Sequence, residues 1–248
     1  MTADDTLLVE DADGVRTITI NRPEVKNALT AAMRARFCAL IDEAEADDGT
    51  RAVIVTAVDP VFSAGVDFKE VAAGTGTATA TNPGATLRAA TTPVVCAVNG
   101  ACVTGALELA LSCTFIVASE RARFADTHAR LDVVAAWGLT ALLPRAVGVR
   151  KAAELSITGN FVDASEALRL GLVNHVVPHD ELLPFTHALV RDIAPTGAVA
   201  EVLDLYRQGD GRTLADALTL EAQHAARRRV DPTAFGAAGA AAAARQKS

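Results

Sequence analysis

Two continuous apolar stretches of strand length constrain the fold of this chain more than any other feature. They cover residues 52–58 and 94–98, and each one ends in a loop that contains glycine. A strand that is apolar at every position, rather than at alternate positions, is typical of a parallel sheet that is covered on both faces. The sequence therefore predicts a buried, largely parallel sheet with helices packed against it.

The rest of the chain indicates a mixed α/β domain. An acidic turn that ends at Gly14 separates two β-prone segments, residues 6–10 and 15–20, which predicts a hairpin. Thr30 is expected to cap an amphipathic helix, and from Gly138 onward the apolar spacing is helical. No linker divides the 248 residues, so one main domain is expected.

Two segments are rich in small residues. Residues 72–84 contain mostly Gly, Thr and Ala, and they are expected to form either a mobile surface loop over a site or a plain flexible insertion. The Ala/Gly-rich tail, residues 232–248, is expected to be partly disordered unless it docks on a neighbouring subunit.

Charge and composition argue against several classes of function. The net charge is −7 and no basic stripe is present, so nucleic acid is not an expected partner. No apolar run approaches the roughly 20 residues of a membrane helix, and the N-terminus does not resemble a signal peptide. The four cysteines lack CxxC spacing, so neither a metal site nor a disulfide framework is expected. Free cysteines are typical of a reducing compartment, so a cytoplasmic location is expected.

Small residues follow both apolar stretches, at strand ends where ligands commonly bind. The second such segment, residues 99–109, turns on Asn-Gly and enters an apolar helix near Gly105. The first N–H groups of a helix lack partners and lie at its positive end, so they can stabilise negative charge on a carbonyl oxygen. Ala106 and Leu107 stand where a phosphate-binding loop needs Lys and Ser or Thr, which disfavours phosphate transfer.

Glu108 lies one helical turn beyond Gly105, inside the apolar run of residues 106–111. A solvated carboxylate is not expected in such a run. Burial disfavours the charged form of a carboxylate and suits it to proton transfer, while a structural glutamate bonded to the backbone is the alternative interpretation.

These segments resemble the enoyl-CoA hydratase/isomerase family, also called the crotonase superfamily. Residues 62–70 are similar to the family's FxAGxDxKE segment, and residues 99–109 resemble its NGxxxGGGxEL segment. In the latter, Thr104-Gly105-Ala106 replaces a glycine triplet and Glu108 matches the catalytic glutamate. Asn21-Arg22-Pro23 and Asn27-Ala28-Leu29 look like the N-terminal motif, and the resemblance extends from residue 15 to about residue 229.

The resemblance implies an α/β fold with a crotonase-like ββα spiral core in residues 1–195 and a helical trimerisation region in residues 196–248. It implies that the N–H groups of Val66 and Gly105 form an oxyanion hole. Glu108 would be the catalytic acid or base. The residues implied to bind the CoA thioester, the first two of them near the nucleotide, are Val25, Lys26, Ala64, Asp67, Phe68 and Lys69.

The chain departs from the family at the second catalytic glutamate of its hydratases, where His128 stands. An imidazole with an ordinary pKa near about 6.5 is a competent acid or base, so His128 could substitute in catalysis, with Asp126 or Asp132 to orient it. The alternative is a histidine that only forms hydrogen bonds. Residues 131–137 also lack the glycine and proline that usually shape the acyl pocket in the family.

Three functions are compatible with these residues. The leading hypothesis is a hydratase that adds water to trans-2-enoyl-CoA through an enolate held by the oxyanion hole. The alternatives are a double-bond isomerase that uses one carboxylate, and an acyl-CoA-binding protein without turnover. The expected partner is an acyl-CoA thioester, with no cofactor other than the coenzyme A of the substrate. The resemblance further implies a homotrimer or a dimer of trimers.

Overall fold

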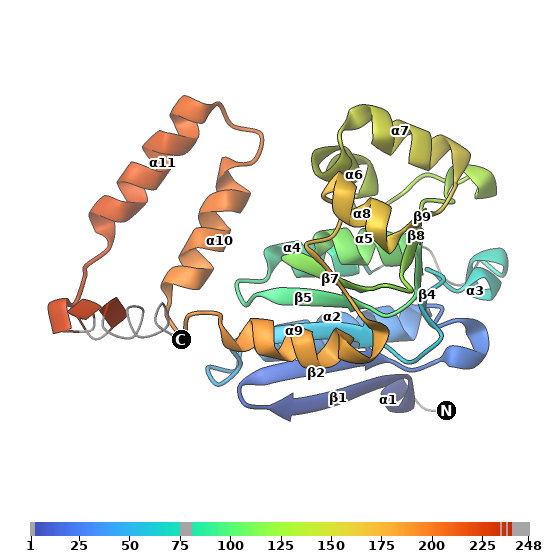
Figure 1. Ribbon diagram of the computed structural model, residues 1–248, viewed down its shortest axis with the longest axis horizontal. Helices are drawn as coiled ribbons and strands as arrows, with labels where there is room; N and C mark the ends of the chain where they lie inside the picture. The colour runs from blue at the N-terminus through green and yellow to red at the C-terminus, as the bar shows by residue number, and fades with distance from the viewer. Residues whose placement is uncertain (1–2, 75–80, 234, 237, 240–248) are drawn as a thin grey trace. The chain divides into compact units, whose positions relative to one another are not determined.

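The computed structural model describes residues 3–74, 81–233, 235–236 and 238–239, and the chain divides into two compact units, Met1–Val199 and Ala200–Ser248 (Figure 1). The expected surface loop at residues 72–84 and the expected disordered tail at residues 232–248 fall partly outside the described residues.

The first unit contains the predicted buried sheet. Its strand order is β1-β2-β3-β5-β7-β10, and only the β1–β2 hairpin is antiparallel among the pairs of this sheet in the described chain. The strands are β1 (Leu7–Ala12), β2 (Val15–Ile20), β3 (Ala52–Ala57), β5 (Val94–Val98), β7 (Phe115–Ser119) and β10 (His175–Val177).

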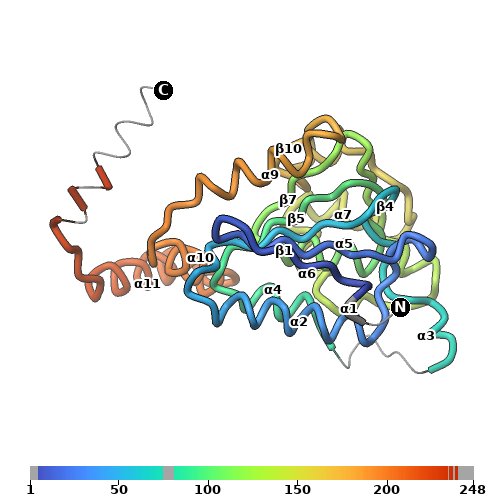
Figure 2. The backbone as a smooth tube through the Cα atoms, turned by 90° about the horizontal axis from the view of Figure 1, so that it is seen from below, coloured from blue at the N-terminus to red at the C-terminus, as the bar shows by residue number. Residues whose placement is uncertain are grey.

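Both apolar stretches form strands that are buried at every position, as predicted. Successive side chains of a strand point to opposite faces of the sheet, so Val53 and Val55 lie in the larger core cluster and Ile54 lies in a second cluster on the opposite face. Figure 2 shows helices α2 (Ala31–Glu45) and α4 (Pro83–Ala89) on one side of the sheet and α9 (Leu182–Arg191) on the other. The fold class is therefore α/β.

A second, smaller sheet has the strand order β4-β6-β8-β9, with β9 antiparallel to β8. Its strands are β4 (Val61–Ser63), β6 (Ala101–Val103), β8 (Arg123–Ala125) and β9 (Val162–Asp163). Strands β4, β6 and β8 follow β3, β5 and β7 directly, so the chain makes three ββ steps, and helices α3 (Phe68–Ala72) and α5 (Gly105–Ser112) follow the first two. This is the expected ββα spiral.

The remaining elements are short turns and helices that pack around the two sheets. Thr30 caps α2 as predicted, because its Oγ1 accepts a hydrogen bond from the N–H of Met33. The other elements of this unit are α1 (Ala3–Thr6), α6 (Leu139–Val147), α7 (Val149–Thr158), α8 (Ala164–Leu170), and the 3₁₀ turns η1 (Pro23–Val25), η2 (Ala129–Leu131) and η3 (His179–Glu181).

The C-terminal unit consists of most of α10 (Ala198–Gly209) and of α11 (Leu214–Arg227). Glu201 accepts a hydrogen bond from Nε2 of His224 at 2.8 Å and forms an ion pair with Arg228, which joins the two helices. Over the described ranges of the chain, no helix is both long and apolar enough to cross a membrane.

Asn27 joins the N-terminal motif to the connection between β3 and β4. Its side chain is fully buried, and its Nδ2 donates to the carbonyl oxygens of Val58 and Val61 at 2.7 Å each. Its Oδ1 accepts from the N–H of Arg22 at 2.8 Å. The backbone of Asn27 has a φ of 54°, a left-handed conformation that asparagine tolerates better than most residues.

We expect Asn27→Ala to lower the free energy of unfolding by about 2–4 kcal/mol, because three partly buried backbone groups lose a fully buried hydrogen-bond partner. Chemical denaturation measures this change. Asn160→Ala is the matched control, since the amide of Asn160 is exposed and makes an exposed hydrogen bond with Arg130. If Asn27→Ala lowered the free energy of unfolding no more than Asn160→Ala does, Asn27 would not have the proposed role in joining the two segments.

Candidate active site

The two segments that follow β4 and β6 meet at one edge of the smaller sheet, because β4 and β6 are parallel neighbours. Gly65 and Gly105 lie at the point of closest approach. A Cβ atom on Gly65 would stand 3.1 Å from the backbone nitrogen of Gly105, and one on Gly105 would stand 3.4 Å from Cγ2 of Val66. Gly65 also has a φ of +91°, so both conformation and space require glycine there.

The N–H groups of Val66 and Gly105 donate no hydrogen bond within the described part of the chain. Leu29 pairs with the residues on either side of Val66, since it donates to the Gly65 carbonyl and accepts from the N–H of Asp67. Gly105 is the first residue of α5, so its N–H has no acceptor within the helix. The structure thus brings together the two backbone donors that the family resemblance implied for an oxyanion hole.

Glu108 is 2% exposed and is bound at both carboxylate oxygens. Its Oε1 accepts from the N–H groups of Trp137 at 2.6 Å and Leu139 at 3.2 Å, while Oε2 lies 3.5 Å from Nε2 of His128. Bonds to the backbone are what the structural interpretation of Glu108 expected. They also hold the carboxylate so that one oxygen faces His128.

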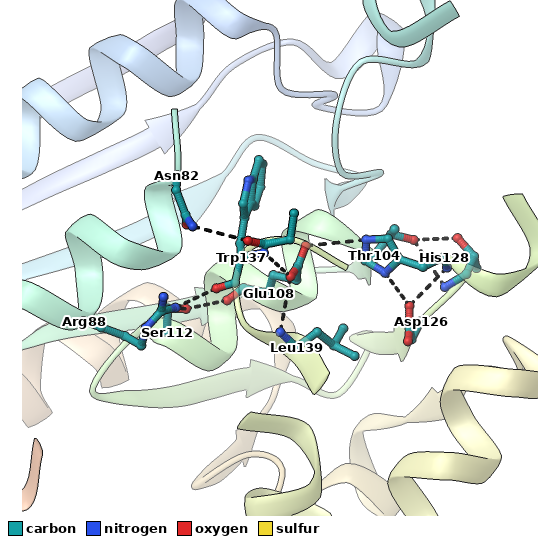
Figure 3. Close-up of polar contacts among 11 residues, drawn as sticks. Asn82, Arg88, Thr104, Glu108, Ser112, Asp126, His128, Trp137 and Leu139 are labelled. Carbon is teal, nitrogen blue, oxygen red and sulfur yellow. Dashed lines mark hydrogen bonds and ion pairs between the residues drawn. The ribbon is translucent and has the colours of Figure 1, made fainter. Parts of the chain in front are cut away.

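Asp126 orients His128, as Figure 3 shows by the contacts from Asp126 through His128 to Glu108. Oδ1 of Asp126 lies 2.6 Å from Nδ1 of His128 and also accepts from the backbone N–H of His128 at 3.1 Å. Both residues follow β8, whose end meets those of β4 and β6. Asp132, the other candidate for this role, is exposed and ends the turn η2.

The pKa of His128 reflects two opposing effects. Burial disfavours its charged form, but the contacts with Asp126 and Glu108 outweigh burial and raise the pKa of His128 to about 9. Burial acts on Asp126 as well, yet its hydrogen bonds with His128 and Ser156 leave the pKa of Asp126 below its usual value. At neutral pH the site therefore holds an imidazolium between two carboxyl groups, and Nδ1 donates to ionised Asp126.

The residues predicted to bind coenzyme A divide into an exposed set and a buried residue. Asp67 is buried, and its Oδ2 pairs with Nη1 of Arg22 at 3.0 Å while its Oδ1 caps α3 through the N–H of Lys69. The Ala64 N–H donates to the Lys26 carbonyl, which brings those two segments together. The exposed or half-buried members of the set are Val25, Lys26, Ala64, Phe68 and Lys69.

Sequence reasoning missed several residues that shape this site. Trp137 and Leu139 act through backbone N–H groups, which no side-chain pattern reveals, although the unusual composition of residues 131–137 pointed to the segment. Arg22 was noted only as part of a motif. Across the residues that the structure describes, no group of three or more His, Cys, Asp and Glu side chains has the arrangement of a metal site.

The chain is similar to known proteins over most of its length. The family model described as "Enoyl-CoA hydratase/isomerase" matches residues 10–229. The "Probable enoyl-CoA hydratase 1, peroxisomal" of Arabidopsis thaliana is 35% identical over 221 residues, which cover 87% of this chain and 83% of that protein. The "Probable enoyl-CoA hydratase echA8" of Mycobacterium leprae is 37% identical over 194 residues, covering 77% of this chain and 76% of the relative.

Solved structures give the same result. The crystal structure of enoyl-CoA hydratase from Mycobacterium tuberculosis H37Rv superposes with a TM-score of 0.77 at 46% sequence identity, and it covers 90% of this chain and 98% of the other. A probable enoyl-CoA hydratase/isomerase from Mycobacterium abscessus superposes with a TM-score of 0.83 at 26% identity, covering 92% of each chain. This chain therefore belongs to the enoyl-CoA hydratase/isomerase family.

Proposed function

We propose that this protein is an enoyl-CoA hydratase that adds water to trans-2-enoyl-CoA thioesters. The observation that carries the proposal is the chain of contacts from Asp126 through His128 to Glu108, placed beside two adjacent N–H groups without acceptors. Relatives named enoyl-CoA hydratase support the same reaction. The donors would hold the thioester oxygen, and the carboxylate and imidazolium would move the protons.

The N–H groups of Val66 and Gly105 would stabilise the enolate that forms when a nucleophile adds to the β carbon. Negative charge then develops on the thioester oxygen, and preorganised donors in a site without water stabilise it strongly. Loss of one such donor typically costs about 10²–10³ in rate. Gly105 adds the positive end of α5 to this effect.

The proton transfers balance if Glu108 acts as base and His128 as acid. Glu108 would take a proton from water while the hydroxyl oxygen bonds to the β carbon, and the Nε2–H of His128 would protonate the α carbon of the enolate. The site is then left with a protonated Glu108 and a neutral His128. The 3.5 Å contact between Oε2 and Nε2 provides a route for the proton to return.

Recognition of the coenzyme A portion is proposed for the exposed residues at the ends of β4 and η1. Lys26 and Lys69 supply positive charge suited to the phosphates of the nucleotide. Phe68, whose side chain is 68% exposed, offers an apolar contact. Asp67 would act on this surface through Arg22 and α3, because its own carboxylate is buried. No cofactor other than the coenzyme A of the substrate is proposed.

The C-terminal unit is proposed to mediate a homotrimer or a dimer of trimers. Its helices expose large apolar side chains, with Tyr206 73%, Leu214 77% and Leu218 56% exposed, which favours burial against another subunit. A cytoplasmic location is proposed as well, and four free cysteines support it.

Replacement of Glu108 by Gln should lower kcat by about 10²–10⁴ with little change in KM, because the amide cannot accept a proton. His128→Gln should have a comparable effect. His128→Glu should retain more activity than His128→Gln, since it places a carboxyl group where the family's hydratases have one. Mass-resolved product analysis with trans-2-enoyl-CoA and 3-enoyl-CoA measures each variant.

Undiminished hydration by Glu108→Gln would remove Glu108 from the mechanism. Conversion of 3-enoyl-CoA to the 2-enoyl isomer without any hydration would replace the hydratase proposal with the isomerase. Binding of every thioester tested with turnover of none would leave only an acyl-CoA-binding protein.

The hydration rate should fall as pH rises through about 9, because His128 then loses the proton that it delivers. Asp126→Asn removes a carboxylate that favours the imidazolium, so the pKa of His128 should fall and the descending limb should move to lower pH. Profiles of kcat/KM against pH measure this shift. Asp132→Asn is the control, and equal limbs in the two variants would contradict the role of Asp126.

The same pKa shift links the protonation of His128 to stability. Protonated His128 adds to the free energy of unfolding through its contacts with Asp126 and Glu108. This addition is complete below pH 6.5, the ordinary pKa of the imidazole, and it is lost as pH rises through about 9.

Light scattering should give a molar mass three or six times that of one chain. Leu214→Glu combined with Leu218→Glu should shift this mass toward the monomer, because charge is costly in a buried apolar contact. Gln223→Glu, an exposed polar position on the same helix, is the control. A monomeric wild-type protein would refute the proposed assembly.

A further inference from the structure

Thr104, the residue directly before Gly105, has a backbone conformation that threonine rarely adopts. Its φ is 58° and its ψ is −112°, in a region that favours glycine. A β-branched residue in such a conformation is strained, and it persists only where the surrounding structure compensates for the strain. The family motif that this segment resembles has glycine at the position.

The hydroxyl of Thr104 makes contacts that glycine could not make. Its Oγ1 lies 2.5 Å from Oγ1 of Thr127 and accepts a hydrogen bond from the N–H of Thr127 at 3.3 Å. The N–H of Thr104 donates to the carbonyl of Ala125 at 2.9 Å. Thr104 is 8% exposed, so little water competes for these bonds. Thr127 stands between Asp126 and His128 in the chain.

The peptide unit between Thr104 and Gly105 is held at its other end as well. The carbonyl of Thr104 accepts from the N–H of Glu108 at 3.1 Å, so it points along α5. In a planar trans peptide the N–H points opposite to the carbonyl. The N–H of Gly105 must therefore point out of the helix, and the ψ of Thr104 determines its direction. Anchoring the Thr104 side chain restricts rotation of that peptide plane.

We propose that Thr104 and Thr127 form a hydroxyl pair that positions the Gly105 N–H in the oxyanion hole. The pair links this donor to the segment that carries Asp126 and His128, so the same contacts hold the group that would stabilise the oxyanion and the group that would move the proton. Thr104, Asp126 and His128 are labelled in Figure 3. Neither threonine is assigned a contact with substrate. The inference rests on the proposed thioester chemistry at this site.

The test compares Thr127→Val, which removes the hydroxyl and keeps the branched shape, with Thr127→Ser, which keeps the hydroxyl. Thr127→Val should lower kcat by about 10- to 100-fold with little change in KM, because a misdirected donor weakens transition-state binding more than substrate binding. Thr127→Ser should remain within about threefold of the wild type, and Thr104→Val combined with Thr127→Val should be no worse than either single change.

A second readout reports on the donor itself. Hexanoyl-CoA labelled with ¹³C at the thioester carbon cannot be hydrated, and its carbonyl stretching frequency falls when the oxygen accepts stronger hydrogen bonds. The bound label should show a lowered frequency in the wild type and in Thr127→Ser, and a smaller change in Thr127→Val. Thr186→Val is the control, because the buried Thr186 hydroxyl donates to Leu182 within α9.

An unchanged carbonyl frequency in Thr127→Val would overturn the proposal, even if kcat falls, since the loss would then act through His128. The proposal would also be overturned if the lowering of the carbonyl frequency in Thr186→Val were as small as that in Thr127→Val. A wild-type protein that lowers the frequency but hydrates no enoyl-CoA would refute the proposed function alone, and the comparison of frequencies would still decide the role of the pair. If Thr127→Val does not fold, Thr127→Ala serves the same comparison.

Discussion

The parallel pairing of β4, β6 and β8 is the constraint on which the site depends. Each strand is three residues long, and each is followed by a segment that carries groups of the candidate active site. These segments are the loop to Val66, the start of α5, and Asp126 with His128. Parallel neighbours end at the same edge of a sheet, so residues separated by about 20 to 60 positions in the chain converge there. The larger sheet, buried on both faces, supplies the rigid base.

Three titratable side chains of the site, those of Glu108, Asp126 and His128, are largely removed from water, so each needs hydrogen-bond partners that replace its hydration. Glu108 is compensated by two backbone N–H groups and by His128, and Asp126 by both the ring and the backbone of His128. Removal of one member leaves a buried charge without its partner, which is far more costly than removing a matched pair. The same bonds orient the groups, so stability and function depend on one set of contacts.

Much of this arrangement could be predicted from the sequence. Fully apolar stretches predicted the buried strands. Glu108 was identified by its place one helical turn beyond Gly105, and His128 by the family resemblance, because it stands at the position of the second glutamate. The three-residue strands β4 and β6 were not predicted individually because they are too short to show a period, and α10 was expected only as part of a helical region, without its own bounds. Asp67 could be assigned to the right loop, but its pairing with Arg22, 45 positions away, depends on tertiary structure. Backbone donors such as Trp137 carry no side-chain signal at all.

The replacement of a second glutamate by His128 is conservative in charge once Asp126 is included. A protonated glutamic acid carries no net charge and holds one transferable proton. Ionised Asp126 with the imidazolium of His128 likewise carries no net charge and holds one proton on Nε2, and a pKa of about 9 for His128 keeps that proton there at neutral pH. The imidazolium alone would add one positive charge to the site. Burial of Asp126 against the ring therefore allows a histidine at this position without a change in net charge.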